Sequence, residues 1–235
     1  MSQDEAGMGR EKCFKLIKRC KNVASMEYIS TLKSCHCINQ GRVFHALLTD
    51  KEHELDPSVG VALVAMYVKF FSVDDAHNVY IRMHRSDEVS LAAIMSGYTN
   101  QGHGEIALEM FGKEYAEPDV VIFICLVKAC TAIGSILQGK IIHAYILEKG
   151  LDSSQILGNA LVDMYAKCKH MLDAFCVFKL ITKRDVVSWC TLITGYVDQG
   201  CNEDALRMFN KMQLEDGILP NRAIFLSLLR ACASM

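Results

Sequence analysis

The 235-residue sequence predicts an all-α fold, a right-handed α-solenoid of stacked helix-turn-helix repeats. Three observations lead to this fold class. Short amphipathic helical patterns follow one another along the chain, the chain is similar to itself at a fixed offset, and its three prolines lie near the starts of the resulting units. Helices this short bury little apolar surface alone, so they have to pack on their neighbours.

Residues 1–24 precede the continuous pattern and are expected to form an N-terminal leader or partial cap. Residues 1–9 are polar, and residues 12–20 (KCFKLIKRC) are expected to form a short basic helix. That helix is either a partner-binding arm or, as we expect, a fraying terminal cap.

From residue 25 onward, paired helical patterns place apolar residues on one face, at spacings of three and four. In the first half, these faces are formed by Tyr28, Leu32 and Cys35, then Val43, Phe44, Leu47 and Leu48; by Leu63, Met66 and Tyr67, then Ala76, Val79, Tyr80 and Met83; and by Ile94, Met95 and Tyr98, then Ala107, Leu108 and Phe111. In the second half, they are formed by Ala160, Leu161, Met164, Tyr165 and Cys168; by Ala174, Val177, Phe178 and Ile181; and by Trp189, Leu192, Ile193 and Tyr196.

The chain repeats itself. At an offset of about 98 residues, 41–111 matches 139–209 without a gap at roughly 26 of about 71 positions. Each block holds three helix pairs, so the underlying unit is about a third of the offset. A period in the thirties with two helices per unit is typical of an α-solenoid.

Composition limits the function classes. The chain is 51% hydrophobic, enough for a sizeable core, and its net charge of −2 gives no global positive field for nucleic acid. No signal peptide precedes the 11 cysteines, which we expect to be reduced, buried hydrophobes of an intracellular or organellar protein. The longest apolar run, Val120 to Val127, is too short to span a bilayer.

Several strings resemble pentatricopeptide repeats: ALVDMYAKC (160–168), RDVVSWCTLITGYVDQG (184–200) and EDALRMFNKM (203–212). VKAC (127–130) followed by QGKIIHAYILEKG (138–150) is similar to the long variant, and the order of long, short and standard units resembles the plant PLS-type array. The W-x₂-L-G-x₂-Y opening of tetratricopeptide repeats is absent. The resemblance implies six repeats, at 25–56, 57–87, 88–119, 120–154, 155–185 and 186–221, and a truncated further repeat at 222–235.

The resemblance implies that one repeat faces one base of single-stranded RNA. In this family the fifth and last residues of a unit read the base edge, and the second residue packs against the base. Unit 155–185 presents Asn159 and Asp185 with Ile156 packing, and an Asn and Asp pair resembles the pattern that favours uracil.

The other units depart from the family's preferred fifth residue, which is Asn, Thr or Ser. Their fifth, last and packing residues are Cys190, Asn221 and Val187; Ala92, Asp119 and Val89; and Val61, Asp87 and Ser58. The long units carry Ile29 and Ile124 at the fifth position. We therefore expect a short, weakly specified tract of about two to four bases.

Structural interpretations compete with these assignments. Asn159 would act only as a helix N-cap, and Asp87, Asp119 and Asp185 would cap the helices that follow them. Lys69 and Lys167, at equivalent places near the end of a first helix, would contact the RNA phosphates or merely complement the helix dipole in solvent.

The sequence offers no residues for an enzyme, a cofactor or a metal site. Residues 35–37 (Cys-His-Cys) lack the C-x₂-C spacing and a second Cys/His pair at finger distance, so we expect a core cysteine at position 35. His45 and His143 recur at the repeat offset, which indicates packing positions. The strings of zinc deaminases, P-loops, serine hydrolases and dinucleotide-binding folds are absent.

Three functions remain open. The leading hypothesis is a single-stranded RNA-binding protein of organellar RNA processing, a C-to-U editing-type adaptor that lacks its own deaminase and works with protein editing cofactors or a deaminase in trans. The alternative is a protein–protein interaction scaffold that uses the concave solenoid surface, and the third is a degenerate product with no RNA target. The family implies a mitochondrion or chloroplast, although the acidic N-terminus is unlike a transit peptide. The sequence stops within a repeat, as a fragment or a truncated product would.

Overall fold

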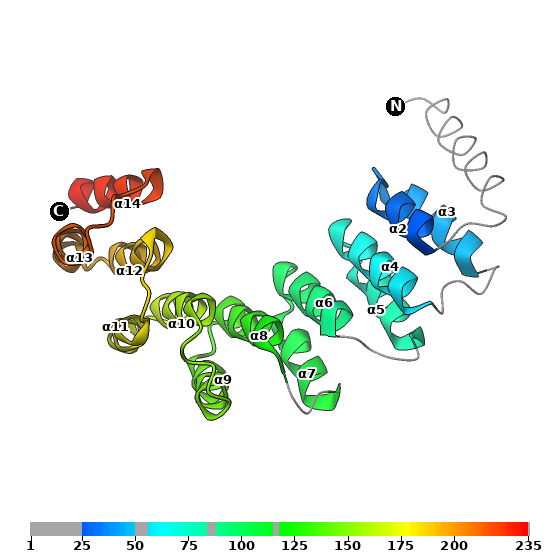
Figure 1. Cartoon of the computed structure of the whole chain (residues 1–235), viewed down its shortest axis with the longest axis horizontal. Coiled ribbons are helices and arrows are strands. Elements are labelled where there is room, and N and C mark those ends of the chain that lie inside the picture. Colours follow the sequence, from blue (N-terminus) through cyan, green and yellow to red (C-terminus); the bar gives the residue numbers. More distant parts are fainter. Residues whose placement is uncertain (1–24, 50–55, 84–87, 115–117, 235) are drawn as a thin grey trace. The chain divides into compact units, whose positions relative to one another are not determined.

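The computed structural model describes residues 25–49, 56–83, 88–114 and 118–234, and every regular element in these ranges is an α-helix. The chain forms two compact units, and the boundary between them in the sequence lies between Gln101 and Gly102. The expected leader at 1–24 and the candidate Asp87 lie outside the described residues. The predicted all-α repeat architecture is confirmed (Figure 1).

Unit 1 contains α2 (Ser25–Lys33), α3 (Ile38–Thr49), α4 (Pro57–Lys69), α5 (Val73–Arg82) and α6 (Glu88–Asn100). Unit 2 contains α7 (Gly104–Glu114), α8 (Val120–Ile133), α9 (Ile136–Glu148), α10 (Gln155–Lys167), α11 (Met171–Leu180), α12 (Val186–Asp198), α13 (Asn202–Leu214) and α14 (Arg222–Ala233).

Each unit has two layers of helices. We call α2, α4, α6, α8, α10, α12 and α14 the first helices, and the odd-numbered helices between them the second helices. Within each unit, first helices pack on the next first helix, as α4 packs on α6 in unit 1 and α10 on α12 in unit 2. The second helices α5, α9, α11 and α13 each pack both on the first helix before them and on the one after them, as α11 does with α10 and α12. The core therefore lies between the two layers.

Helix-capping side chains set where the first helices begin. The N-cap residues Asp56, Asp119, Ser154, Asp185 and Asn221 each accept a hydrogen bond from a backbone N–H in the first turn of the helix that follows. The capped helices α4, α8, α10 and α12 start at residues 57, 120, 155 and 186, which coincide with the first residues of four expected units. The last residue of an expected unit is thus the N-cap of the next helix.

Small residues bring neighbouring helices into contact. The alanines at 76, 107, 174 and 205 are fully buried. A Cβ added to Gly139 of α9 would lie 2.6 Å from the sulfur of Met164 on α10, so a larger residue there would have to displace the end of that methionine side chain. Gly102 and Gly200 adopt positive φ angles of 85° and 74° after their helices, in agreement with the left-handed cap expected there.

Tyrosine–histidine hydrogen bonds join successive repeats. The Nδ1 atoms of the second-helix histidines lie 2.8 to 2.9 Å from the hydroxyls of tyrosines on the next first helix. The pairs are His45 with Tyr67, His77 with Tyr98, and His143 with Tyr165. His45 and His143 therefore have a structural role between repeats.

None of the described helices is long and apolar enough to cross a membrane.

Candidate nucleic-acid interface

The second residue of each first helix points out of the core. In unit 2, Val121, Ile156 and Val187 are 52%, 65% and 52% exposed. In unit 1, Val89 is 65% exposed, and Ser58 is exposed as well. Branched aliphatic side chains at these repeated positions leave at least half of their surface open to solvent, where a ligand could make apolar contacts.

The fifth residues are more enclosed. Asn159, Cys190 and Val61 are half-buried, and Ala92 is buried. Ile29 and Ile124 of the long units are also half-buried and offer no polar atom.

Asn159 is an interior residue of α10, because Ser154 is the N-cap of that helix. The interpretation of Asn159 as a helix cap is therefore wrong. Its side-chain oxygen is buried and has no hydrogen-bond partner within the part of the chain that the structure describes. An unsatisfied buried acceptor costs about 1–3 kcal/mol, so this oxygen is a candidate to accept a hydrogen bond from a ligand.

The last residues of the units hold helix starts. Asp119 accepts from the Ile122 N–H at 2.8 Å, and Asn221 accepts from the Ile224 N–H at 3.0 Å. Asp185 accepts from the Val187 and Ser188 N–H groups at 3.0 and 2.9 Å in a capping box. The capping interpretation of Asp119 and Asp185 thus describes the structure, and any role in base reading has to be compatible with it.

Burial alone would raise the pKa of Asp185. Hydrogen bonds from Ser188, Val187 and the side chain of Gln155 outweigh this effect and hold the pKa below its ordinary value. Asp185 is therefore an ionised acceptor at neutral pH, and it remains exposed to solvent.

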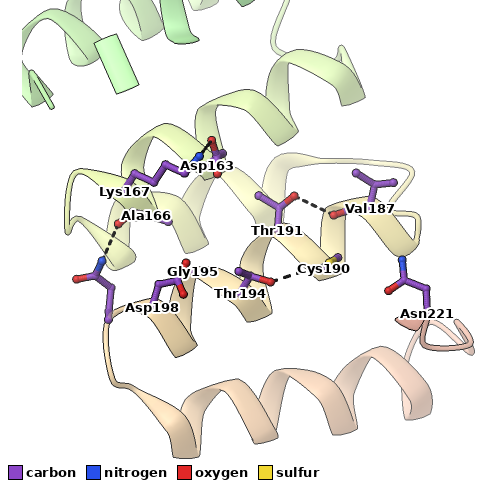
Figure 2. Close-up of a pocket in the computed structure, with 11 residues that line it drawn as sticks. Asp163, Ala166, Lys167, Val187, Cys190, Thr191, Thr194, Gly195, Asp198 and Asn221 are labelled. Carbon is purple, nitrogen blue, oxygen red and sulfur yellow. Dashed lines mark hydrogen bonds and ion pairs between the residues drawn. The ribbon is translucent and has the colours of Figure 1, made fainter. Parts of the chain in front are cut away.

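A pocket of about 470 Å³ brings together four of the predicted residues: Lys167, Val187, Cys190 and Asn221. It lies between α10 and α12, and Asn221 closes one end at the start of α14 (Figure 2). Asn159 and Asp185 do not line this pocket.

The pocket also contains polar residues that sequence reasoning missed. They are Asp163, Thr191, Thr194, Asp198 and Gln199. Thr191 follows Val187 by four residues and Thr194 follows Cys190 by four, so they continue the helical faces of these two positions, and that spacing was the available signal. The hydroxyl of Thr194 lies 3.0 Å from that of Ser227 on α14.

The two candidate phosphate-binding lysines differ in their partners. Lys69 donates to the Cys35 carbonyl at 3.3 Å. Lys167 pairs with Asp163 of its own helix at 2.8 Å, at the pocket rim (Figure 2). Asp198 takes the equivalent place on α12 and pairs with Arg230 at 2.7 Å.

No group of three His, Cys, Asp or Glu side chains in the described ranges could hold a metal ion. Cys35 is buried and Cys37 is exposed.

Comparison with known proteins places these features in a family. The pattern that describes the PPR repeat family matches residues 184–234, and that of the single PPR repeat matches residues 159–186. The Arabidopsis thaliana pentatricopeptide repeat-containing protein At4g08210 is 34% identical over 204 residues, which is 83% of this chain and 30% of the relative. The chloroplastic protein CRR2 of the same plant is 34% identical over 218 residues, 88% of this chain and 33% of that protein.

A mitochondrial relative and a solved structure extend the comparison. The mitochondrial Arabidopsis thaliana protein At2g03880 is 31% identical over 209 residues, 88% of this chain and 33% of the relative. The crystal structure of PPR10 in complex with an 18-nt psaJ RNA element superposes with a TM-score of 0.68 at 22% identity, over 81% of this chain and 30% of that one. This chain thus spans about a third of the length of these proteins. On its repeated helical hairpins and these relatives, the chain belongs to the pentatricopeptide repeat family.

Proposed function

We propose that this chain binds single-stranded RNA, with one base at each repeat that carries polar residues at its reading positions. The observation that carries the proposal is the pocket between α10 and α12. There an exposed aliphatic residue, Val187, lies beside a fifth residue, Cys190, and a unit-ending residue, Asn221. An apolar side chain supports the face of a base, and polar groups beside it read the base edge.

Helix capping fixes which atoms of the unit-ending residues are available to a base. The Asn221 side-chain oxygen caps α14, so its amide nitrogen remains as a donor toward the pocket (Figure 2). The nitrogen suits a base with an acceptor at the reading edge, such as cytosine N3 or adenine N1. Asp185 has only acceptors, so it suits a base that donates, such as uracil N3–H. With Asn159 as the fifth residue of the same unit, we assign uracil to unit 155–185.

The cellular role that we infer is organellar RNA processing in a mitochondrion or chloroplast. It is supported by relatives named as chloroplastic or mitochondrial and by the RNA bound in the PPR10 structure. We further propose a PLS-type array and an editing-type adaptor that acts with protein editing cofactors or a deaminase in trans. The order of long, short and standard units supports the array type.

The carboxylates that line the pocket favour the alternative function, a protein–protein interaction scaffold. Asp163 and Asp198 neutralise Lys167 and Arg230 beside the pocket, which weakens attraction for phosphate. We prefer RNA because the exposed aliphatic residues Ile156 and Val187 each belong to a unit with polar groups that suit a base. These groups are Asn159 and Asp185 in the first unit and Asn221 in the second.

Selection from a random RNA pool tests the proposal. The 235-residue chain should enrich a short motif, and Asn159→Thr should change the preferred base at one position only. Asn210→Thr, on the exposed face of α13, is the matched control and should leave the motif unchanged. Absence of any enriched motif, or an Asn210→Thr effect equal to that of Asn159→Thr, would contradict RNA reading by unit 155–185.

A further inference from the structure

An apolar surface lies on the second-helix layer of unit 2, away from the proposed reading positions. On α9, Leu137 and Ile141 are 71% and 60% exposed, and Ala144 is exposed one turn later. On α11, Leu172 is 85% exposed and Cys176 follows it, also exposed. Spacings of three and four residues place each set on one face of its helix. We call these five residues the outer patch.

An ion pair joins the two helices near their starts, where the Lys140 ammonium of α9 is 3.2 Å from the Asp173 carboxylate of α11. Leu180, 58% exposed, extends the apolar surface at the end of α11.

The internal repeat supplies a control for this surface. The helix pair α3 and α5 lies about 98 residues earlier and carries the same ion pair, between Arg42 and Asp75 at 2.7 Å. At four equivalent positions, however, its residues are Asn39, Asp74, Asn78 and Arg82 in place of Leu137, Leu172, Cys176 and Leu180, whereas Val43 and Ala46 keep the apolar character of Ile141 and Ala144. The ion pair recurs in both blocks, and the fold forms without apolar side chains at these four positions. Exposed apolar surface that the fold does not need indicates a protein partner.

We propose that the outer patch binds a second copy of this chain, with α9 and α11 each antiparallel to its own counterpart. The charges on the two helices support this arrangement. On α9, Lys140 lies near the start and Glu148 at the end, whereas on α11, Asp173 lies near the start and Lys179 near the end. Antiparallel docking places Lys140 against Glu148 of the second copy and Asp173 against Lys179 of the second copy. Each Lys140–Asp173 pair is thereby extended into a four-charge network.

The spacing of these charges locates the two-fold axis. Lys140 and Glu148 are equally distant from Ala144 in the sequence, and Asp173 and Lys179 are equally distant from Cys176. Ala144 and Cys176 therefore face their own copies, which is the property of a self-complementary interface. Both side chains are small, so the helices can approach closely at the crossing point. This contact requires no RNA and goes beyond the proposed function.

Sedimentation velocity on the RNA-free chain tests the interface. An interface of two short helices is small, so we expect a dimer with a dissociation constant of about 1–100 μM. A fourfold variant, Leu137→Asn, Leu172→Asp, Cys176→Asn and Leu180→Arg, gives the patch the residues of the earlier block, which the same fold already accommodates. It should weaken dimerisation by at least about tenfold with unchanged circular dichroism. Glu148→Lys should weaken it by about threefold to tenfold.

The matched control is Leu229→Glu on α14, a leucine that is 66% exposed outside the patch. This variant should dimerise like the wild type. A wild-type chain that stays monomeric throughout, or a dimer that is lost in Leu229→Glu but kept in the fourfold variant, would overturn the proposal.

Oxidation tests the position of the axis. Diamide accepts two electrons and two protons from a pair of facing Cys176 thiols and becomes the hydrazine, while the two sulfurs form one disulfide. We expect a covalent dimer on a non-reducing gel, absent in Cys176→Ser, although Cys176→Ser should still dimerise in sedimentation. The described residues include other exposed thiols at Cys37, Cys201 and Cys232, which can also cross-link. A covalent dimer no more abundant in the wild type than in Cys176→Ser would therefore refute this axis. RNA selection tests only the proposed base-reading positions, whereas sedimentation and oxidation test only the outer patch. Failure of the proposed dimer and failure of the proposed RNA binding are therefore distinguishable.

Discussion

Asp185 links the stability of one helix to the proposed reading of one base. Its carboxylate accepts from two N–H groups at the start of α12 and from the Ser188 hydroxyl. The same residue type at Asp119 caps α8. A substitution that removes the side chain therefore cannot separate the capping role from a role in RNA binding. A substitution that keeps the capping hydrogen bonds can.

Asp185→Asn is that substitution. Asn caps helices as well as Asp does, so the free energy of unfolding should change little, but the side chain then offers a donor toward the base. We expect the preferred base of unit 155–185 to move from uracil toward cytosine in RNA selection. Asp185→Ala is the comparison: it should cost about 0.5–2 kcal/mol of stability and weaken binding without a new preference. A uracil preference that survives in Asp185→Asn would show that Asp185 only caps.

His143 makes stability depend on pH. Burial lowers its pKa, and the smaller attraction of Asp173 opposes this effect. The unfolded chain takes up a proton near the ordinary pKa of about 6.5, while the folded chain does so only at lower pH. The His143 contribution to stability is therefore present above that pH and is lost as the pH falls below it.

We predict that His143→Phe reduces the loss of thermal stability between about pH 7.5 and 5. Tyr165→Phe, which removes the hydroxyl hydrogen-bonded to His143 but leaves the imidazole buried, should keep most of the pH dependence. Melting curves recorded by circular dichroism at both pH values give the comparison. An equal pH dependence in wild type and His143→Phe would assign the effect to other groups.

At the scale of elements, sequence periodicity located the helices because apolar faces and capping residues agree. The expected unit starts at 57, 120, 155 and 186 each follow an Asp or Ser, the side chains that accept from first-turn N–H groups. Two features could not be predicted. Phe71 and Lys169 adopt positive φ angles of 57° and 64°, although neither is a glycine. The tight turn from a first to a second helix imposes that conformation, and residue preference alone does not reveal it.

Lys169→Gly should stabilise the chain by about 0.5–1 kcal/mol, because glycine adopts positive φ without the Cβ penalty. Lys211→Gly, in the last turn of α13, should instead destabilise it by a similar amount. Denaturant unfolding of both variants provides the measurement. Destabilisation by Lys169→Gly would mean that the lysine side chain contributes more than the strain costs.

The candidate site was only partly predictable, for a related reason. The repeat register gave Val187, Cys190 and Asn221, which line one pocket. It did not give Asp163 or Asp198, because their influence comes from ion pairs, of which the Asp198–Arg230 pair spans two helices. Helix spacing shows which residues share a face, but it does not show which charges are already neutralised.

At the scale of the whole molecule, the net charge of −2 becomes informative through its placement. The pocket cation Lys167 and the nearby Arg230 are both paired with carboxylates. RNA would have to displace those carboxylates before phosphate contacts form. We therefore expect weak binding with a shallow dependence on salt.

Asp163→Asn should release Lys167 for a phosphate. We expect RNA affinity to rise by about threefold to tenfold, and the slope of log K against log salt to steepen by about 0.7 for one added contact to single-stranded RNA. Asp204→Asn removes one negative charge from α13, outside the pocket, and controls for net charge. Fluorescence anisotropy between about 50 and 200 mM salt gives both values. Equal gains in the two variants would attribute the effect to net charge instead.

The capping role of the unit-ending residues has a consequence for redesigning this chain. Side chains that start a helix well are few, chiefly Asp, Asn, Ser and Thr. If the same position reads a base, only those four residue types are available for reading, and exchanges among them leave the fold intact. Exchanges among these residue types at Asp119, Asp185 and Asn221 would then change the RNA target with little loss of stability. Any other residue type at these positions would weaken the helix that follows.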